Sequence, residues 1–216
     1  MLKEILDTDA SGVLDLCGLE CVRGGRTLFT GLNRSIQAGE LLRVQGANGT
    51  GKTSLLRMLC GLLAPTQGQV RWRGQAITGL REEFGRELVY LGHAAALKDD
   101  LSPQENLQAA CVLAGRRVHR AETLRALREC GLHGHENIPV RRLSQGQRRR
   151  AALARLALSS SAGLWVLDEP FNALDTAATS WLEGLVRAQL RRGAVVVLTS
   201  HQSVALDDAP RQELAL

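Results

Sequence analysis

Two continuous apolar runs mark the second half of the chain, at residues 164–167 and 195–199. Short runs without polar interruption are typical of strands that are buried on both faces of a parallel sheet. Between them, Leu182, Val186 and Leu190 recur at the spacing of one helix face. A strand, an amphipathic helix and a second strand in this order predict a parallel-sheet core with helices packed on it.

The first half of the chain has strand patterns that are more polar. Residues 13–16 and 28–36 predict two strands joined by a turn at Gly24 and Gly25, because glycine accepts the backbone angles of tight turns. Further strands are predicted at residues 41–44, 69–73 and 88–91. We expect the last of these to enter the core.

Between residues 93 and 158 the pattern changes to helices. Ser102 and Glu105 form a capping box, with a proline at the first helical position. A second helix is expected at about residues 121–130, where a glycine ends it, and a third from about residue 143 to 155. This segment predicts a helical insertion into the core.

The composition is that of one globular domain over residues 1–216. Hydrophobic residues make up 44% of the chain, yet no apolar run approaches the roughly 18 residues of a membrane span. The charged N-terminus does not resemble a signal peptide. The five cysteines lack metal-binding spacing, which predicts small buried side chains in a reducing cytosol.

The net charge is +5, and runs of arginine raise the question of a nucleic-acid partner. Solvated helix faces and contacts to phosphates or acidic partners explain such runs as well. Only 3% of the residues are aromatic, so the stacking surfaces that bind single-stranded nucleic acid are nearly missing. We therefore expect no nucleic-acid partner.

The strongest chemical signal is the sequence GANGTGKTS, which follows the strand pattern at 41–44 and precedes a helical pattern that runs to about residue 63. It consists of Gly46, Ala47, Asn48, Gly49, Thr50, Gly51, Lys52, Thr53 and Ser54. In a phosphate-binding loop, backbone N–H groups and a helix N-terminus face the phosphates. Lys52 can reach the β- and γ-phosphates, and Thr53 can bind Mg²⁺. The flanking strand and helix disfavour the alternative, a glycine-rich turn without a ligand.

Two further motifs narrow the chemistry. Asp168 and Glu169 follow the strand at 164–167, where Asp168 is placed to hold Mg²⁺ and Glu169 to orient and polarise the attacking water. A second anion site is predicted at the start of a basic helix, which opens with Leu143, Ser144, Gln145, Gly146 and Gln147. His201 follows the strand at 195–199 and could bond a γ-phosphate through a neutral imidazole. An ordinary strand-end histidine is the alternative for His201.

Together these motifs resemble the nucleotide-binding domain of ABC transporters over essentially the whole chain. The resemblance implies that residues 46–54 are the Walker A loop and residues 143–147 the signature. Asp168 and Glu169 would be the Walker B aspartate and the catalytic glutamate. A P-loop kinase or GTPase is disfavoured, because neither the signature nor the pair of carboxylates is typical of those enzymes.

The same resemblance implies the fold class: an α/β P-loop NTPase with a RecA-like parallel-sheet core, an N-terminal antiparallel β-subdomain and a helical insertion. The core and β-subdomain would cover about residues 1–92 and 159–216, and the helical subdomain with the signature about 93–158. Asp175 would lie in the D-loop, and His201 would be the switch histidine. In this family two domains sandwich two ATP molecules, and each site takes its signature serine from the partner. ATP binding then closes the homodimer and hydrolysis reopens it.

Three residues depart from the family pattern. Arg23 stands where an aromatic side chain usually stacks on adenine, although a planar guanidinium can stack as well. Gln145 replaces a signature glycine, which is tolerable at a helix start. His93 replaces the glutamine that senses Mg²⁺ and the membrane partner, and it could still bond the attacking water.

The departures and several short motifs narrow the resemblance to the ATP-binding subunit of the haem exporter of cytochrome c maturation. The motifs are RTLF at 26–29, LGH at 91–93, ENL at 105–107, IPV at 138–140, DEPF at 168–171 and TSHQ at 199–202. That family pairs two copies of this subunit with two membrane-spanning subunits, on the cytoplasmic face of the bacterial inner membrane. Its ATPase activity drives haem delivery to a periplasmic chaperone. The segment 97–103 would lie where the membrane partner docks.

Two alternatives within the fold remain. The chain could be the ATP-binding subunit of another ABC transporter, or a soluble ABC-type ATPase acting on nucleic acid or ribosomes. The soluble relatives carry long coiled-coil insertions or a second tandem domain. The short interval between His93 and Ser144 favours a transporter subunit.

Overall fold

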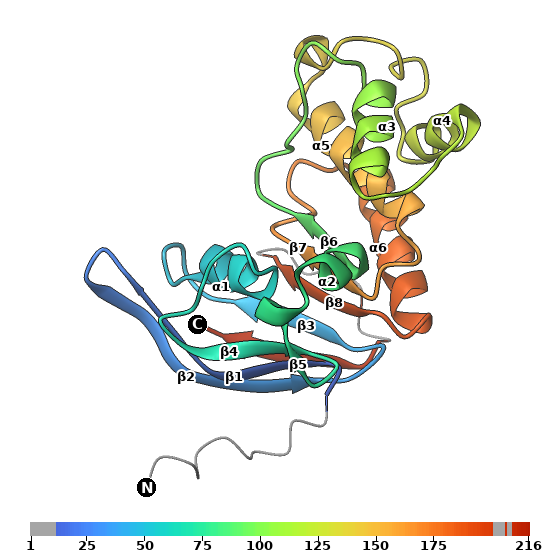
Figure 1. Cartoon of the computed structure of the whole chain (residues 1–216). Helices are drawn as coiled ribbons and strands as arrows, with labels where there is room; N and C mark the ends of the chain where they lie inside the picture. The colour runs from blue at the N-terminus through green and yellow to red at the C-terminus, as the bar shows by residue number, and fades with distance from the viewer. Residues whose placement is uncertain (1–11, 201–205, 207–208) are drawn as a thin grey trace, which may run out of the picture.

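The computed structural model describes residues 12–200, 206 and 209–216. Figure 1 shows two lobes, of which the larger holds both sheets and helix α1 (Lys52–Leu59). The smaller lobe holds helices α3 (Pro103–Leu113), α4 (Arg120–Glu129) and α5 (Gln145–Leu153). The parallel core, the separate antiparallel sheet and the helical insertion that the sequence predicts are confirmed.

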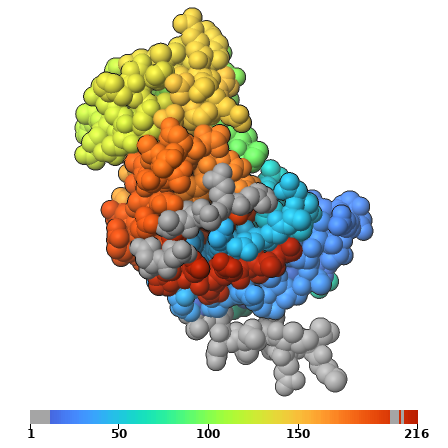
Figure 2. Space-filling model, turned by 180° about the vertical axis from the view of Figure 1, so that it is seen from behind, coloured from blue at the N-terminus to red at the C-terminus, as the bar shows by residue number. Residues whose placement is uncertain are grey.

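A five-stranded parallel sheet forms the core. Its order is β6 (Leu88–Leu91), β7 (Leu164–Leu167), β8 (Val195–Thr199), β3 (Leu41–Gln45) and β9 (Arg211–Ala215). All neighbouring strands in it run parallel. The predictions for β6, β7 and β8 are confirmed. Strand β9 was not predicted, because its sequence mixes polar and apolar residues. Figure 2 shows the residues of β9 as a red band across the larger lobe, with the yellow helical lobe at the top.

The central strands are apolar throughout because both of their faces are buried. Leu164 and Val166 pack in a cluster with α1 and the antiparallel sheet. Trp165 and Leu167, one position along, pack in a second cluster with helix α6 (Thr176–Arg191). Successive strand side chains point to opposite faces, so a two-sided core needs an unbroken apolar run. Each fully buried aliphatic side chain contributes about 1.5–3 kcal/mol through removal of its surface from water.

The antiparallel sheet is larger than the sequence analysis predicted. Its order is β2 (Arg26–Ile36), β1 (Leu14–Arg23), β4 (Gln67–Trp72) and β5 (Gln75–Ala76). The first two strands continue to the predicted turn at Gly24 and Gly25, since backbone pairing persists beyond the apolar residues through bulges. Two short helices in this region were missed, η1 (Ile77–Gly79) and α2 (Arg81–Glu87).

The helix ends differ from the predictions by a few residues. Helix α1 ends at Leu59, earlier than predicted, and Gly61 follows with a φ of 69°. Helix α5 ends at Leu153 and continues as η3 (Ala154–Leu158), and η2 (Val140–Arg142) precedes it. The capping box of α3 is confirmed: the Ser102 hydroxyl accepts from the Glu105 N–H, and the Glu105 carboxylate accepts from the Ser102 N–H.

Four of the five cysteines are buried, and the fifth, Cys17, is half-buried. Burial raises the pKa of the Cys130 thiol to about 12, so at neutral pH it is an uncharged side chain of the helical lobe. The prediction that the cysteines act as small apolar residues agrees with this packing.

Candidate active site

The loop between β3 and α1 has the backbone that phosphate binding needs. Gly46, Gly49 and Gly51 have φ angles of 148°, 85° and 108°, in the region that favours glycine. A Cβ at Gly46 would lie 2.6 Å from the carbonyl oxygen of Leu216, which excludes larger residues. No side chain caps α1, and its first turn has no acidic residue. The positive end of this helix therefore faces the loop without a competing carboxylate.

Lys52 and Thr53 begin α1 and contact different parts of the site. Lys52 Nζ donates to the carbonyl oxygens of Gly46 and Ala47, at 2.7 and 3.0 Å. The Thr53 hydroxyl donates to Oδ2 of Asp168 at 2.9 Å, across 115 positions of the chain. The phosphate loop and the end of β7 thus meet directly.

Thr199, the last residue of β8, contacts both Asp168 and Glu169 after β7. The Thr199 hydroxyl donates to Oδ1 of Asp168 at 2.9 Å and accepts from the Glu169 N–H at 2.8 Å. Asp168 is 3% exposed. Glu169 has a φ of 49°, a left-handed conformation that costs a non-glycine residue roughly 1–2 kcal/mol. The sequence analysis did not predict a role for Thr199. Its position as a hydroxyl residue at the end of a buried strand could have indicated one.

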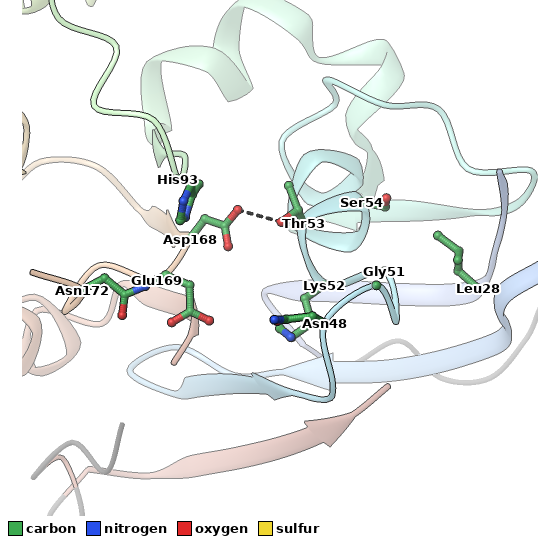
Figure 3. A pocket seen from close by; sticks show the side chains of 11 residues that line it. Leu28, Asn48, Gly51, Lys52, Thr53, Ser54, His93, Asp168, Glu169 and Asn172 are labelled. Atoms are coloured by element: carbon green, nitrogen blue, oxygen red, sulfur yellow. Dashed lines mark hydrogen bonds between the residues drawn. The ribbon is translucent and has the colours of Figure 1, made fainter. Parts of the chain in front are cut away.

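These residues surround a cavity of about 420 Å³. It is lined by Leu28, Asn48, Gly49, Gly51, Lys52, Thr53, Ser54, His93, Asp168, Glu169 and Asn172. In Figure 3, Lys52 and Thr53 lie on one side, with Asp168, Glu169 and His93 opposite. The structure therefore brings together residues that the sequence analysis assigned to Walker A and Walker B.

Some predicted residues of the site lie outside the lining of this cavity. Gly46 borders a smaller adjacent cavity, and the Thr50 hydroxyl donates to the Ala47 carbonyl within the loop. Arg23 is exposed at the end of β1, opposite Arg26. The antiparallel sheet contributes Leu28 to the cavity instead, a residue to which the sequence analysis gave no binding role.

The predicted signature lies at the start of α5 in the helical lobe. Ser144 caps the helix: its hydroxyl accepts from the Gln147 N–H at 3.2 Å, and the Gln147 side chain accepts from the Ser144 N–H at 2.9 Å. Leu143 is buried, while Ser144 and Gln145 are exposed. Residues 143–147 do not line the cavity beside the phosphate loop.

The start of α5 packs against the segment that leads into α6. A Cβ at Gly146 would lie 3.0 Å from the carbonyl oxygen of Ala173. Asp175 caps α6 by accepting from the Ala178 N–H, and it pairs with Arg150 of α5 at 3.6 Å. The signature and the predicted D-loop are thus neighbours within one chain.

His201, the remaining predicted site residue, lies outside the described residues.

Comparison with known proteins decides the family. A family model described as ABC transporter matches residues 29–172. The chain is 48% identical over 204 residues to the cytochrome c biogenesis ATP-binding export protein CcmA of Dechloromonas aromatica, which covers 94% of this chain and 100% of that protein. It is 51% identical over 192 residues to the protein of the same name from Aromatoleum aromaticum, covering 89% and 87%. The chain belongs to the ABC transporter family.

Within the ABC transporter family, the chain belongs to the cytochrome c biogenesis ATP-binding export proteins, as its short motifs predict. It is an ATP-hydrolysing transporter subunit.

Solved ABC structures share its fold. A putative ABC transporter ATP-binding protein from Pyrococcus furiosus has a TM-score of 0.77 at 23% identity, covering 93% of this chain and 96% of that one. The dimeric ATP-binding cassette MJ0796, bound to ADP and phosphate, has a TM-score of 0.72 at 23% identity, covering 88% of each chain.

Proposed function

We propose that this ABC subunit hydrolyses ATP in the cavity beside the phosphate loop and thereby drives haem export, or haem delivery to a periplasmic chaperone, in cytochrome c biogenesis. The contact between Thr53 and Asp168 carries the proposal, because it joins the Walker A loop to the Walker B strand. The names of its relatives support the role in cytochrome c biogenesis.

The residues of the loop and of α1 are proposed to bind the triphosphate. The loop has three glycines in conformations that other residues rarely adopt, and two of them, Gly49 and Gly51, line the cavity. Lys52 would exchange its two carbonyl partners for phosphate oxygens, which are stronger acceptors for a cation. Arg23, exposed at the end of β1, would stack on the adenine.

Mg²⁺ is proposed as the cofactor. The Thr53 hydroxyl and the Asp168 carboxylate, 2.9 Å apart, are the oxygen donors that this cation prefers, and His93 lines the same cavity. The bound ion would neutralise charge on the phosphates. The proposed role of His93 is to bond a water molecule beside that ion.

Glu169 is proposed to orient and polarise the attacking water. Its N–H bond to Thr199 fixes the peptide that precedes its side chain, so the backbone that carries the carboxylate is in place before ATP binds. His201 would bond the γ-phosphate from the end of β8. Lys52 would stabilise negative charge on the transferred group.

The second anion site is proposed to act on the partner's ATP. Ser144 lies outside the cavity of its own chain, which supports a homodimer that closes on ATP with each signature facing the opposite Walker A loop. None of the described helices is both long and apolar enough to cross a membrane. We propose that two copies bind two membrane-spanning subunits from the cytoplasmic face of the inner membrane, with the segment 97–103 of the proposed helical subdomain at about 93–158 as the contact.

A deletion strain of the source bacterium tests this function. Mature c-type cytochromes, detected on haem-stained gels, should disappear and return with a plasmid-borne wild-type copy. The Glu169→Gln variant should not restore them, although it keeps the fold. Normal cytochromes in the deletion strain would exclude the role in cytochrome c biogenesis, and rescue by Glu169→Gln would exclude a need for hydrolysis.

A further inference from the structure

Arg149 is a buried arginine on α5, directly after the signature. Its side chain is 7% exposed and reaches the carboxyl ends of β6 and β7. Nη2 donates to the carbonyl oxygens of Asp168 and Glu169, at 2.9 and 2.7 Å. Nη1 donates to the carbonyl oxygens of Gly92 and His93, at 3.2 and 3.3 Å. One guanidinium therefore joins the signature helix to two loops that line the active-site cavity.

Burial of the charged guanidinium of Arg149 costs free energy of desolvation. Among the described residues, this guanidinium forms no ion pair with a carboxylate. Burial lowers the pKa of its guanidinium, while the nearby charges of Asp168 and Glu169 act in the opposite direction. Its four hydrogen bonds go to backbone carbonyls, and Nε has no hydrogen-bond partner among the described residues. Burying a cation that has only carbonyl partners costs free energy. A gain in stability therefore does not explain this arginine, whereas its geometry suggests another role.

The partners of Arg149 point to that role. Asp168, Glu169 and His93 all line the cavity, from two different strand ends. Glu169 is in a left-handed conformation, which the surrounding contacts must maintain. Thr199 holds the N–H of Glu169, and Arg149 holds its carbonyl, so the residue is fixed through both of its peptide groups. The planar fork of a guanidinium can span both loops, whereas a single ammonium cannot match four acceptors.

We propose that Arg149 is a positioning residue for ATP hydrolysis, which sets the placement of Glu169 relative to His93 and ties it to the signature helix. This inference rests on the proposed roles of those two residues. Because Ser144 lies on the same helix, a displacement of α5 on dimer closure would act on both loops through one side chain. Arg149 touches no proposed position of ATP, so it acts on the chemical step and not on nucleotide affinity.

Kinetics of Arg149 variants test the proposal. In Arg149→Met, kcat for ATP should fall at least about tenfold, while KM and the Kd for a fluorescent ATP analogue stay within about threefold. Arg149→Lys keeps the charge and part of the hydrogen bonding, so its kcat should lie between those of Arg149→Met and the wild type. Arg149→Lys also serves as the test if the Met variant does not fold.

Arg116→Ala is the matched control. Arg116 lies in the same lobe, and its Nη1 donates to the carbonyl oxygen of Leu158 at 2.8 Å, away from the cavity. Its loss should lower the melting temperature but leave kcat unchanged. An unchanged kcat in a folded Arg149 variant, a KM that rises by the same factor as kcat falls, or an equal loss of kcat in Arg116→Ala would each overturn the positioning role. A wild-type protein without ATPase activity would instead overturn the proposed function itself.

Discussion

Helices α1 and α5 both begin at a predicted anion site, but their first turns are built differently. Helix α1 starts after Gly51, and no side chain caps it. Helix α5 is capped by Ser144, and its capping box with Gln147 engages the N–H groups of those two residues. An uncapped N-terminus leaves its donors for a ligand, whereas a capped one satisfies them within the chain. Helix α1 therefore keeps its first donors for phosphate, whereas α5 already uses the N–H groups of Ser144 and Gln147 within the chain.

The surroundings of the two helix starts differ as well. The start of α1 shares a cavity with Asp168 and Glu169. The start of α5 is in the other lobe, beside the segment that leads into α6. Two helices with the same dipole therefore have different roles: one builds the site of its own chain, and the other is proposed to complete the site of a partner.

The largest expected effect comes from Lys52→Ala, which removes the only side-chain cation described in the cavity lining. Hydrolysis should fall at least about 100-fold, because a preorganised positive group at the phosphates is lost. Phosphate release measures the rate, and equilibrium titration with an ATP analogue measures the affinity. In the isolated subunit, Lys98→Ala, which changes an exposed lysine outside the cavity, should match the wild type. Unchanged hydrolysis in Lys52→Ala would remove α1 from the site.

A mixture of two inactive variants tests whether α5 acts on the partner. Ser144→Glu places a carboxylate where a phosphate would approach, while the helix dipole still favours it. Mixed with Lys52→Ala, each heterodimer would contain one intact site, so activity should return to at most about a quarter of the wild type in an equal mixture. Phosphate release before and after mixing measures this. A mixture as inactive as its components would contradict a shared site.

A smaller effect is expected from Ser144→Ala. The loss of one hydroxyl contact to a charged phosphate should lower kcat about tenfold, since hydrogen bonds to charged groups contribute about 1.5–3 kcal/mol. The affinity of the isolated subunit for an ATP analogue should not change, because Ser144 is outside its own cavity. A weaker affinity in dilute, monomeric protein would place the signature in the same chain's site.

The smallest effect on activity is expected from Ser102→Ala, which serves as a control for the capping box. Ser102 caps α3 with the same pair of hydrogen bonds that Ser144 makes on α5. Its loss should destabilise the fold by about 1 kcal/mol and leave kcat unchanged. Denaturant unfolding and phosphate release separate the two quantities. If Ser102→Ala lowered kcat as much as Ser144→Ala, the effect at Ser144 would be one of helix stability.

The sequence predicts those elements of this protein that depend on residue types within one short segment. The phosphate loop, the capping box of Ser102 and the strands at 164–167 and 195–199 follow from residue types at fixed spacing. The ends of β1 and β2 could not be predicted, because pairing with a neighbour extends a strand past its apolar residues. The strand β9 was missed because its stability comes from its place beside β3.

The sequence by itself determined the candidate residues for the chemistry: Lys52, Asp168 and Glu169 belong to motifs whose spacing predicts their function. Only the tertiary structure decided how they are held. Thr199 joins the Asp168 carboxylate to the backbone N–H of Glu169, and Arg149 holds the carbonyls of both residues. Neither role has a local pattern. Such contacts join residues far apart in the chain, and the order of the parallel strands, which no periodicity encodes, brings them together.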